Sequence, residues 1–193
     1  LLNHSGRDYI ASRGEYLNAR LMAEYLGYAF VDSAEWLIFN YNGKVNFEKS
    51  YENLAKIVEK TPKIVIPGFY GAMPDGSIKT FSRGGSDITG AIAAAAIDAD
   101  MYENWTDVSG IMTADPRIVE NPRPIENVTF AELRELSYMG AEVLHEETVF
   151  PVRQKNIPLY IKNTNDMNAR GTLIMESFDA ETDANTSFIT GIS

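Results

Sequence analysis

Apolar residues recur at helical spacing in several stretches of the chain. In the first stretch they are Leu17, Leu21, Met22 and Leu26. This spacing predicts a helix over residues 12–27, with Ser12 as its N-cap and Gly27 as its C-terminal stop. Further helices are predicted over residues 50–60, 87–98, 129–139 and 141–154. A Thr129–Glu132 capping box opens the helix at 129–139. The small side chains of residues 87–98 (DITGAIAAAAID) indicate close packing against a neighbouring element.

Short apolar runs between these helices predict strands over residues 28–31, 63–67, 101–105 and 157–161. The run KIVIP at 63–67 is typical of a strand buried on both faces. A hairpin is predicted over residues 68–81, around the turn formed by Pro74, Asp75 and Gly76. Strands that alternate with helices indicate an α/β layer fold with a mainly parallel sheet.

Composition adds limits to this picture. The 193 residues suffice for one substantial domain, and 45% of them are hydrophobic. Seventeen Lys and Arg against 27 Asp and Glu give a net charge of -10, which argues against a nucleic-acid surface. No apolar run reaches the ~18 residues of a membrane span, and the first residues do not resemble a signal peptide. The chain has no cysteine, so disulfides and cysteine-ligated zinc are excluded.

Both ends indicate a piece of a longer protein. The chain starts at Leu1 without a methionine, and residues 188–193 resemble the first strand of a further domain. Residues 176–187 are polar and rich in turn-forming residues, which is typical of a linker. We therefore expect a catalytic region over residues 1–175, a linker over 176–187, and the start of another domain over 188–193.

The stretch FSRGGSDITG, residues 81–90, offers candidate chemistry. Arg83 can hold a carboxylate or phosphate with two parallel hydrogen bonds. Gly84 and Gly85 let backbone amides approach a ligand, and Ser86 and Asp87 lie where a helix with free amides begins. A glycine turn with a serine or aspartate N-cap is the alternative explanation. The residues alone leave both open, with the second glycine and the arginine slightly favouring a site.

For the other candidates, the residues alone favour a structural explanation. Thr106 and Asp107 end a predicted strand, where α/β folds place ligands, but Asp115-Pro116 can be a plain turn and Arg117 a solvated side chain. Glu15 completes a capping-box pattern with Ser12. His145 beside two glutamates is not spaced like a metal site.

Several long motifs, in this order and spacing, resemble the kinase domain of aspartokinases. They are SRGEYLNARLMAEYL, FSRGGSDITGAIAAAAIDAD, ENWTDVSGIMTADPRIV, MGAEVLHEETVFPV and IPLYIKNTND…GTLI. The resemblance spans about residues 8–174. It implies a three-layer α/β/α sandwich of the amino-acid-kinase type. It also implies transfer of the γ-phosphoryl group of ATP to the side-chain carboxylate of L-aspartate, in lysine, threonine and methionine synthesis.

Carried over residue by residue, the resemblance implies two sets of site residues. The aspartate set is Glu15, Arg83, Gly84, Gly85, Ser86 and Asp87, with Asp87 closest to a catalytic role. The nucleotide set is Thr106, Asp107, Met112, Arg117, Glu142 and Val143. Arg83 suits the substrate α-carboxylate, while Glu15 and Asp87 suit its ammonium group or a catalytic lysine. ATP and Mg²⁺ are the implied cofactors, and no residue of this chain is assigned as a metal ligand.

The sequence departs from the family pattern in two places. The family's Gly-Ala-Lys-Val-Leu-His-Pro reads GAEVLHE here, so Glu142 replaces a lysine expected near the nucleotide. The family's Lys-Phe-Gly-Gly-Ser segment, with its catalytic lysine, is expected before Leu1, so this chain alone should be inactive. The resemblance further implies a regulatory ACT domain after the linker, feedback by lysine or threonine, a homo-oligomer, and a cytoplasmic location.

Three alternatives remain open at this point. A related kinase such as glutamate 5-kinase would share the fold and use another amino acid. The chain could also belong to a fused aspartokinase–homoserine dehydrogenase. A silent regulatory paralogue that binds amino acids or nucleotide is the third, and Glu142 motivates it.

Overall fold

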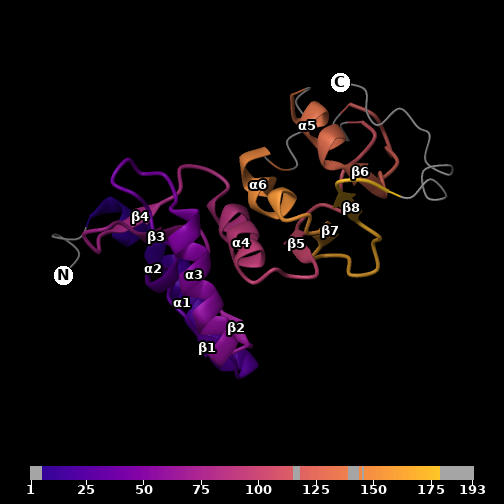
Figure 1. The fold of residues 1–193 in the computed structure, drawn as a ribbon. Coiled ribbons are helices and arrows are strands. Elements are labelled where there is room, and N and C mark those ends of the chain that lie inside the picture. The colour runs from indigo at the N-terminus through magenta and orange to yellow at the C-terminus, as the bar shows by residue number, and fades with distance from the viewer. Residues whose placement is uncertain (1–5, 115–117, 139–143, 145, 179–193) are drawn as a thin grey trace. The chain divides into compact units, whose positions relative to one another are not determined.

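The computed structural model describes residues 6–114, 118–138, 144 and 146–178 of the chain. The chain divides into two compact units, Leu1–Asp98 and Ala99–Ser193. Figure 1 labels the helices and strands of both units. Helices and strands are interspersed along the chain, and within the described residues three strand pairs are parallel and two are antiparallel. The predicted α/β class with mainly parallel pairing is confirmed.

The longest helix of the first unit is α1 (Arg7–Leu26). It begins at Arg7 rather than at the predicted N-cap, Ser12, because residues 7–11 contain no glycine or proline that would stop a helix. Ser12 lies inside α1, where its buried hydroxyl donates to the Tyr9 carbonyl at 2.8 Å. The prediction of Ser12 as N-cap is therefore wrong, and so is the capping box with Glu15. Gly27 ends the helix with a left-handed φ of 67°, as predicted.

The buried face of α1 is made of small side chains. Ser12, Ala19 and Ala23 are buried, whereas Leu17 is 63% and Leu21 is 68% exposed. Helix α1 packs against the strands β1 (Ala29–Phe30) and β4 (Ile78–Thr80). Small side chains permit this close approach, so apolar spacing predicted the helix but not the face that it buries.

The strands of the first unit form two short sheets. Strand β1 pairs in parallel with β2 (Ile64–Val65), whose side chains are half-buried and not buried on both faces as predicted. Strand β3 (Tyr70–Ala72) pairs with β4 as an antiparallel hairpin. The hairpin confirms the predicted turn, in which Gly76 has a φ of 82°.

Three more helices complete the first unit: α2 (Ser33–Trp36), α3 (Phe47–Lys60) and α4 (Gly85–Ala96). Helix α2 was not predicted. Helix α4 packs against α3, and its alanines at 91, 94, 95 and 96 are buried, which confirms the predicted close packing. The central core cluster consists of Val31, Trp36, Leu37, Leu54, Ile92 and Ala96.

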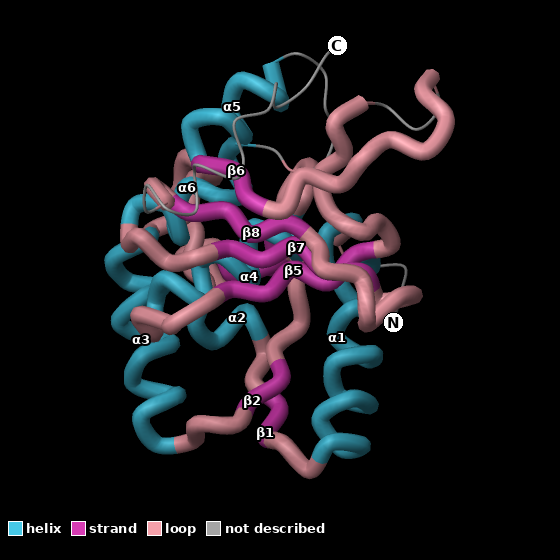
Figure 2. The backbone as a smooth tube through the Cα atoms, turned by 90° about the vertical axis from the view of Figure 1, so that its right-hand side faces the viewer, coloured by secondary structure: helices cyan, strands magenta, loops and turns pink. Residues whose placement is uncertain are grey.

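The second unit is built on a four-stranded sheet. Its strands are β5 (Tyr102–Thr106), β7 (Leu159–Asn163), β8 (Thr172–Met175) and β6 (Asn127–Thr129), side by side in that order (Figure 2). Strands β5 and β7 are parallel, and their register sets Thr106 opposite Asn163. The carboxyl ends of these two strands are therefore neighbours. Strands β6 and β8 were not predicted.

The described part of the second unit contains two helices, α5 (Phe130–Tyr138) and α6 (Glu146–Gln154). The predicted capping box opens α5: the Thr129 amide donates to Glu132 Oε2 at 2.8 Å, and the Glu132 amide donates to Thr129 Oγ1 at 3.2 Å. Helix α6 matches the end of the prediction over 141–154. Residues 139–143 and 145 lie outside the described part of the chain.

None of the helices in the described ranges is long and apolar enough to cross a membrane.

Candidate active site

The start of helix α4 brings five predicted site residues together, from Arg83 to Asp87. Gly84 is the N-cap, with a left-handed φ of 56°, and it makes no side-chain cap hydrogen bond. Ser86 and Asp87 lie in the first helical turn, so neither is the N-cap. The explanation of this stretch as a serine- or aspartate-capped turn is therefore wrong. What remains is a helix N-terminus that begins on two glycines, where backbone amides point outward and favour an anion.

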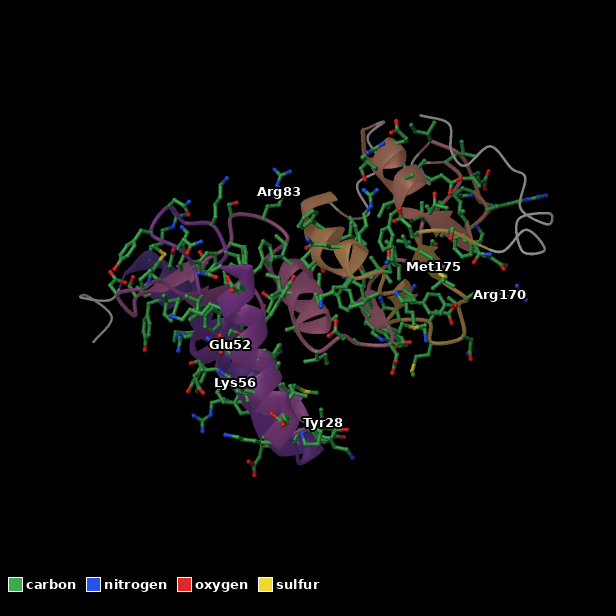
Figure 3. The ribbon with its side chains drawn as sticks, viewed as in Figure 1. Tyr28, Glu52, Lys56, Arg83, Arg170 and Met175 are labelled. Carbon is green, nitrogen blue, oxygen red and sulfur yellow. The ribbon has the colours of Figure 1, made fainter. Side chains whose placement is uncertain are left out.

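Arg83 lies on the connection between β4 and α4, and its side chain is exposed and points away from the ribbon (Figure 3). Asp87 is half-buried and Ser86 is exposed. A guanidinium, a hydroxyl, a carboxylate and helix-terminal amides thus lie within five consecutive residues. This set can hold a small ligand that carries both an anionic and a cationic group.

Glu15 lies on helix α1 of the same unit. Its side chain is exposed, in the third turn of the helix. The first turn of α1 is attached to β4, because the Thr80 amide donates to Asp8 Oδ2 at 3.2 Å. Strand β4 in turn leads directly into the connection that carries Arg83. One short strand therefore connects the two elements that carry the predicted aspartate set.

A cluster of aromatic side chains surrounds Arg13, two residues before Glu15. The guanidinium carbon of Arg13 lies 4.4 Å from the ring centre of Tyr9, 4.5 Å from that of Tyr16 and 5.5 Å from that of Tyr70. Its Nη2 also donates to Ser12 Oγ at 2.9 Å. Such stacking fixes an arginine and stabilises the helix segment that carries Glu15.

Tyr70 connects this cluster to helix α2. It is fully buried, and its hydroxyl donates to Asp32 Oδ1 at 2.7 Å. Asp32 is also the N-cap of α2 and accepts from the Ala34 amide at 3.0 Å. Burial raises the pKa of Tyr70, and the hydrogen bond to Asp32 raises it further. The phenol therefore stays protonated and keeps its hydrogen bond to Asp32.

Two residues of the predicted nucleotide set, Thr106 and Asp107, lie in the second unit at the carboxyl end of β5. Thr106 Oγ1 donates to Asp107 Oδ1 at 3.2 Å. The Thr106 carbonyl accepts from the amide and the hydroxyl of Thr164, at 2.8 and 2.9 Å. Asn163 Nδ2 donates to Ser109 Oγ at 2.8 Å, which ties the loop after Asp107 to the end of β7. The loop is thus held from the neighbouring strand.

Met112 follows in this loop, where it forms a bridge with Pro124. The preceding residue, Ile111, is bound to strand β8, because its amide donates to Thr172 Oγ1 at 2.8 Å. Arg117, Glu142 and Val143 lie outside the described residues. The structure therefore describes the aspartate set within the first unit, and half of the nucleotide set within the second.

Within the described residues, no three His, Cys, Asp or Glu side chains gather as a metal site. Mg²⁺ is usually held by one or two carboxylates, several waters and the phosphates of its nucleotide. Among the predicted site residues that the structure describes, Glu15, Asp87 and Asp107 carry carboxylates. His145 lies outside the described residues.

Sequence reasoning missed several residues that shape these regions: Arg13, Asp32, Tyr70, Thr89, Ser109, Asn163 and Thr172. Their contacts join segments that are far apart in the chain, as from Asp32 to Tyr70 or from Ser109 to Asn163. Helical or strand periodicity carries no signal for such pairs. One hint was available: Asn163 follows a predicted strand, as Thr106 does, and ligands often bind at the carboxyl ends of parallel strands.

Comparison with curated proteins finds aspartokinases. Aspartokinase 3 of Bacillus subtilis is 41% identical over an alignment of 180 residues that covers 89% of this chain and 40% of that protein. The lysine-sensitive aspartokinase 3 of Escherichia coli is 34% identical over 179 residues, covering 86% of this chain and 40% of that protein. The chain thus spans about 40% of the length of these relatives.

Solved structures agree. Clostridium acetobutylicum aspartate kinase superimposes with a TM-score of 0.86 at 56% identity, over 90% of this chain and 40% of that one. Escherichia coli aspartokinase III, in complex with aspartate and ADP, gives 0.81 at 30% identity, over 90% and 41%. Uridylate kinase from Archaeoglobus fulgidus, at 22% identity and a TM-score of 0.58, shares the fold alone. The model of the amino acid kinase family matches residues 2–163, and the chain therefore belongs to that family.

Proposed function

We propose that the protein containing this chain is an aspartate kinase, which converts ATP and L-aspartate into ADP and 4-phospho-L-aspartate. The observation that carries the proposal is the start of α4, where Arg83, two glycines, Ser86 and Asp87 present groups that match an amino-acid substrate. The similarity to aspartokinases over 89% of the chain supports the choice of aspartate.

The reaction joins two anions. An oxygen of the substrate β-carboxylate attacks the γ-phosphorus and forms the new phosphorus–oxygen bond of an acyl phosphate. The bond from the γ-phosphorus to the oxygen bridging it to the β-phosphate breaks, and ADP leaves with that electron pair. The carboxylate is already ionised at neutral pH, so the attack needs no base. The protein therefore contributes positioning and neutralisation of charge.

Each residue of the aspartate set has a proposed role in that task. Arg83 pairs with the α-carboxylate in a fork geometry, which leaves the β-carboxylate to react. Asp87 and Glu15 attract the substrate ammonium group or a catalytic lysine from the rest of the protein. The amides at Gly84 and Gly85 face the phosphoryl group during its transfer, where helix-terminal donors stabilise developing negative charge.

Thr106, Asp107 and Met112 are proposed to line the nucleotide site, together with Arg117, Glu142 and Val143. Mg²⁺ is proposed to arrive with ATP and to neutralise part of the phosphate charge. This help matters because the chain itself carries a net charge of -10, which opposes the approach of a nucleotide.

Replacing Glu142 by lysine tests the unusual residue of the proposed nucleotide set. We expect Glu142→Lys in the full-length protein to lower the Kd for ATP about tenfold, because it exchanges a repulsive charge for an attractive one near phosphates. Calorimetric titration with MgATP measures the change. Glu142→Gln should give about half of the effect on a logarithmic scale. An unchanged Kd in both variants would remove residue 142 from the site.

Regulation and assembly are also proposals for the whole protein. Escherichia coli aspartokinase III has been solved with lysine and aspartate. We propose that an ACT domain beyond residue 187 binds lysine or threonine and mediates feedback inhibition. We also propose that the protein is a homo-oligomer, is cytoplasmic, and acts in lysine and threonine synthesis. The same proposal places the end of the catalytic region at residue 175 and the end of the linker at residue 187.

The direct test is steady-state turnover of the full-length protein with a panel of amino acids. We expect kcat/KM for L-aspartate to exceed that for L-glutamate by on the order of a thousandfold, because an extra methylene displaces the reacting carboxylate from the phosphorus. A preference for glutamate would favour the glutamate 5-kinase alternative. Binding of nucleotide without turnover of either would favour a silent regulatory paralogue.

A further inference from the structure

Thr89 is a buried polar residue on α4, one turn beyond the proposed aspartate site. Its side chain is 1% exposed. The hydroxyl donates to the Gly85 carbonyl at 2.6 Å, as a threonine inside a helix often does. The same oxygen also accepts from the Phe69 amide at 3.0 Å. This second bond leaves the helix and reaches the segment before strand β3.

The backbone of Phe69 is held on both sides. Its amide is bound by Thr89, and its carbonyl accepts from the Phe81 amide at 2.9 Å. Phe69 has a φ of 77°, in the left-handed region that a phenylalanine rarely adopts. A non-glycine residue keeps such a conformation only where its surroundings impose it. The two hydrogen bonds hold the backbone of Phe69 from both sides.

Two glycines bring this segment into backbone contact with the start of α4. A Cβ added to Gly85 would lie 2.9 Å from Phe69 Cα, and a Cβ added to Gly68 would lie 2.8 Å from Ser86 Oγ. Both distances are shorter than real contacts allow. The segment at 68–69 and the first turn of α4 therefore pack so closely that neither glycine leaves room for a side chain, and Thr89 bonds to both.

We propose that Thr89 is a positioning residue for the aspartate site. By joining the Gly85 carbonyl to the Phe69 amide, it fixes where the first turn of α4 begins, and hence where Ser86, Asp87 and the glycine amides meet the substrate. This inference rests on the proposed aspartate kinase function. It adds a residue whose side chain touches no ligand but sets the geometry of those that do.

The test compares variants of the full-length protein in steady-state kinetics. Thr89→Val keeps the shape but removes the hydroxyl, so it leaves the Phe69 amide without its acceptor. We expect the KM for aspartate to rise about tenfold while the KM for ATP stays within twofold. Thr89→Ser keeps the hydroxyl and should restore an aspartate KM within about twofold of the wild type.

Ser50→Ala is the matched control. Ser50 is also buried on a helix of the first unit, donates to the carbonyl one turn earlier at 2.7 Å, and accepts from the Ile38 amide at 3.0 Å. Its loss should lower the melting temperature and leave both KM values unchanged. If Thr89→Val behaves like this control, with lower stability and an unchanged aspartate KM, Thr89 is structural only and the proposal fails.

Gly68→Ala disturbs the same contact from the other side and leaves Thr89 intact. Its added methyl group is expected to displace Ser86 and to raise the aspartate KM, with the ATP KM unchanged. This variant decides the question if Thr89→Val does not fold, and an unchanged aspartate KM would then overturn the proposal. A wild-type protein that does not phosphorylate aspartate would instead refute the proposed function, and the positioning role with it.

Discussion

Replacing Arg83 by alanine in the full-length protein is expected to raise the KM for aspartate on the order of a hundredfold, with the KM for ATP within twofold. The guanidinium of Arg83 is the exposed cation beside the glycine start of α4, and a fork-shaped pair with a carboxylate is lost entirely in alanine. Since Arg83 is proposed to pair with the α-carboxylate of aspartate and not with the nucleotide, the KM for ATP should change little. Initial rates over a matrix of aspartate and ATP concentrations separate the two constants.

Two further variants make the result specific. Arg83→Lys keeps the charge but not the fork, and should recover only part of the loss. Arg170→Ala removes an exposed arginine that pairs with Glu126 in the second unit and should leave both KM values unchanged. Equal increases in the aspartate and ATP constants of Arg83→Ala would contradict the assignment of Arg83 to the amino-acid substrate.

Gly71→Ala is expected to destabilise the first unit by about 3 kcal/mol. A Cβ on Gly71 would lie 2.3 Å from the Leu37 carbonyl oxygen, a backbone atom of a fully buried residue. That carbonyl also accepts the Ala72 amide at 2.9 Å, so it cannot move without breaking the bond between α2 and β3. Relieving the clash therefore requires a shift of the backbone at Leu37 or Gly71, which costs free energy.

Urea denaturation followed by tryptophan fluorescence measures this effect. Trp36 is fully buried in the core of the first unit, and a Trp105→Phe background removes the signal from the second unit. Gly14→Ala is the control, because nothing lies within 4 Å of its added Cβ and the residue is inside α1. It should stabilise by roughly 0.5 to 1 kcal/mol. A Gly71→Ala change of less than about 1 kcal/mol would show that the Leu37 carbonyl can yield.

The elements that the sequence predicted well are those with local signals. Gly27 ends α1 because a glycine readily takes the left-handed conformation, and the Thr129–Glu132 box opens α5 through bonds three residues apart. Strands β6 and β8 were missed because each is short and is defined by pairing with partners far away in the chain, β6 with β8 and β8 also with β7. The prediction of Ser12 as an N-cap failed because a serine hydroxyl can donate to a carbonyl inside a helix as well as accept from an amide at a helix start.

The candidate site likewise contains residues that local sequence signals predict and residues that only distant contacts bring into place. The residues from Arg83 to Asp87 are contiguous, so their joint position at a helix start was predictable from glycine and helix propensity. Thr89 was not, because its second partner, Phe69, lies 20 residues earlier in the chain. Arg13 and Tyr70 likewise meet only in the folded unit. The proposed substrate came from motif resemblance, since periodicity cannot distinguish one carboxylate from another.

The most direct measurement of the central claim is chemical trapping of the product. Full-length protein is incubated with MgATP, L-aspartate and hydroxylamine, which converts an acyl phosphate into a stable hydroxamate, and the product is identified by mass spectrometry. The account predicts the β-hydroxamate of aspartate in an amount equal to the ADP released, and its loss when aspartate is omitted. Release of ADP without any hydroxamate, or a hydroxamate formed from glutamate in preference to aspartate, would contradict it.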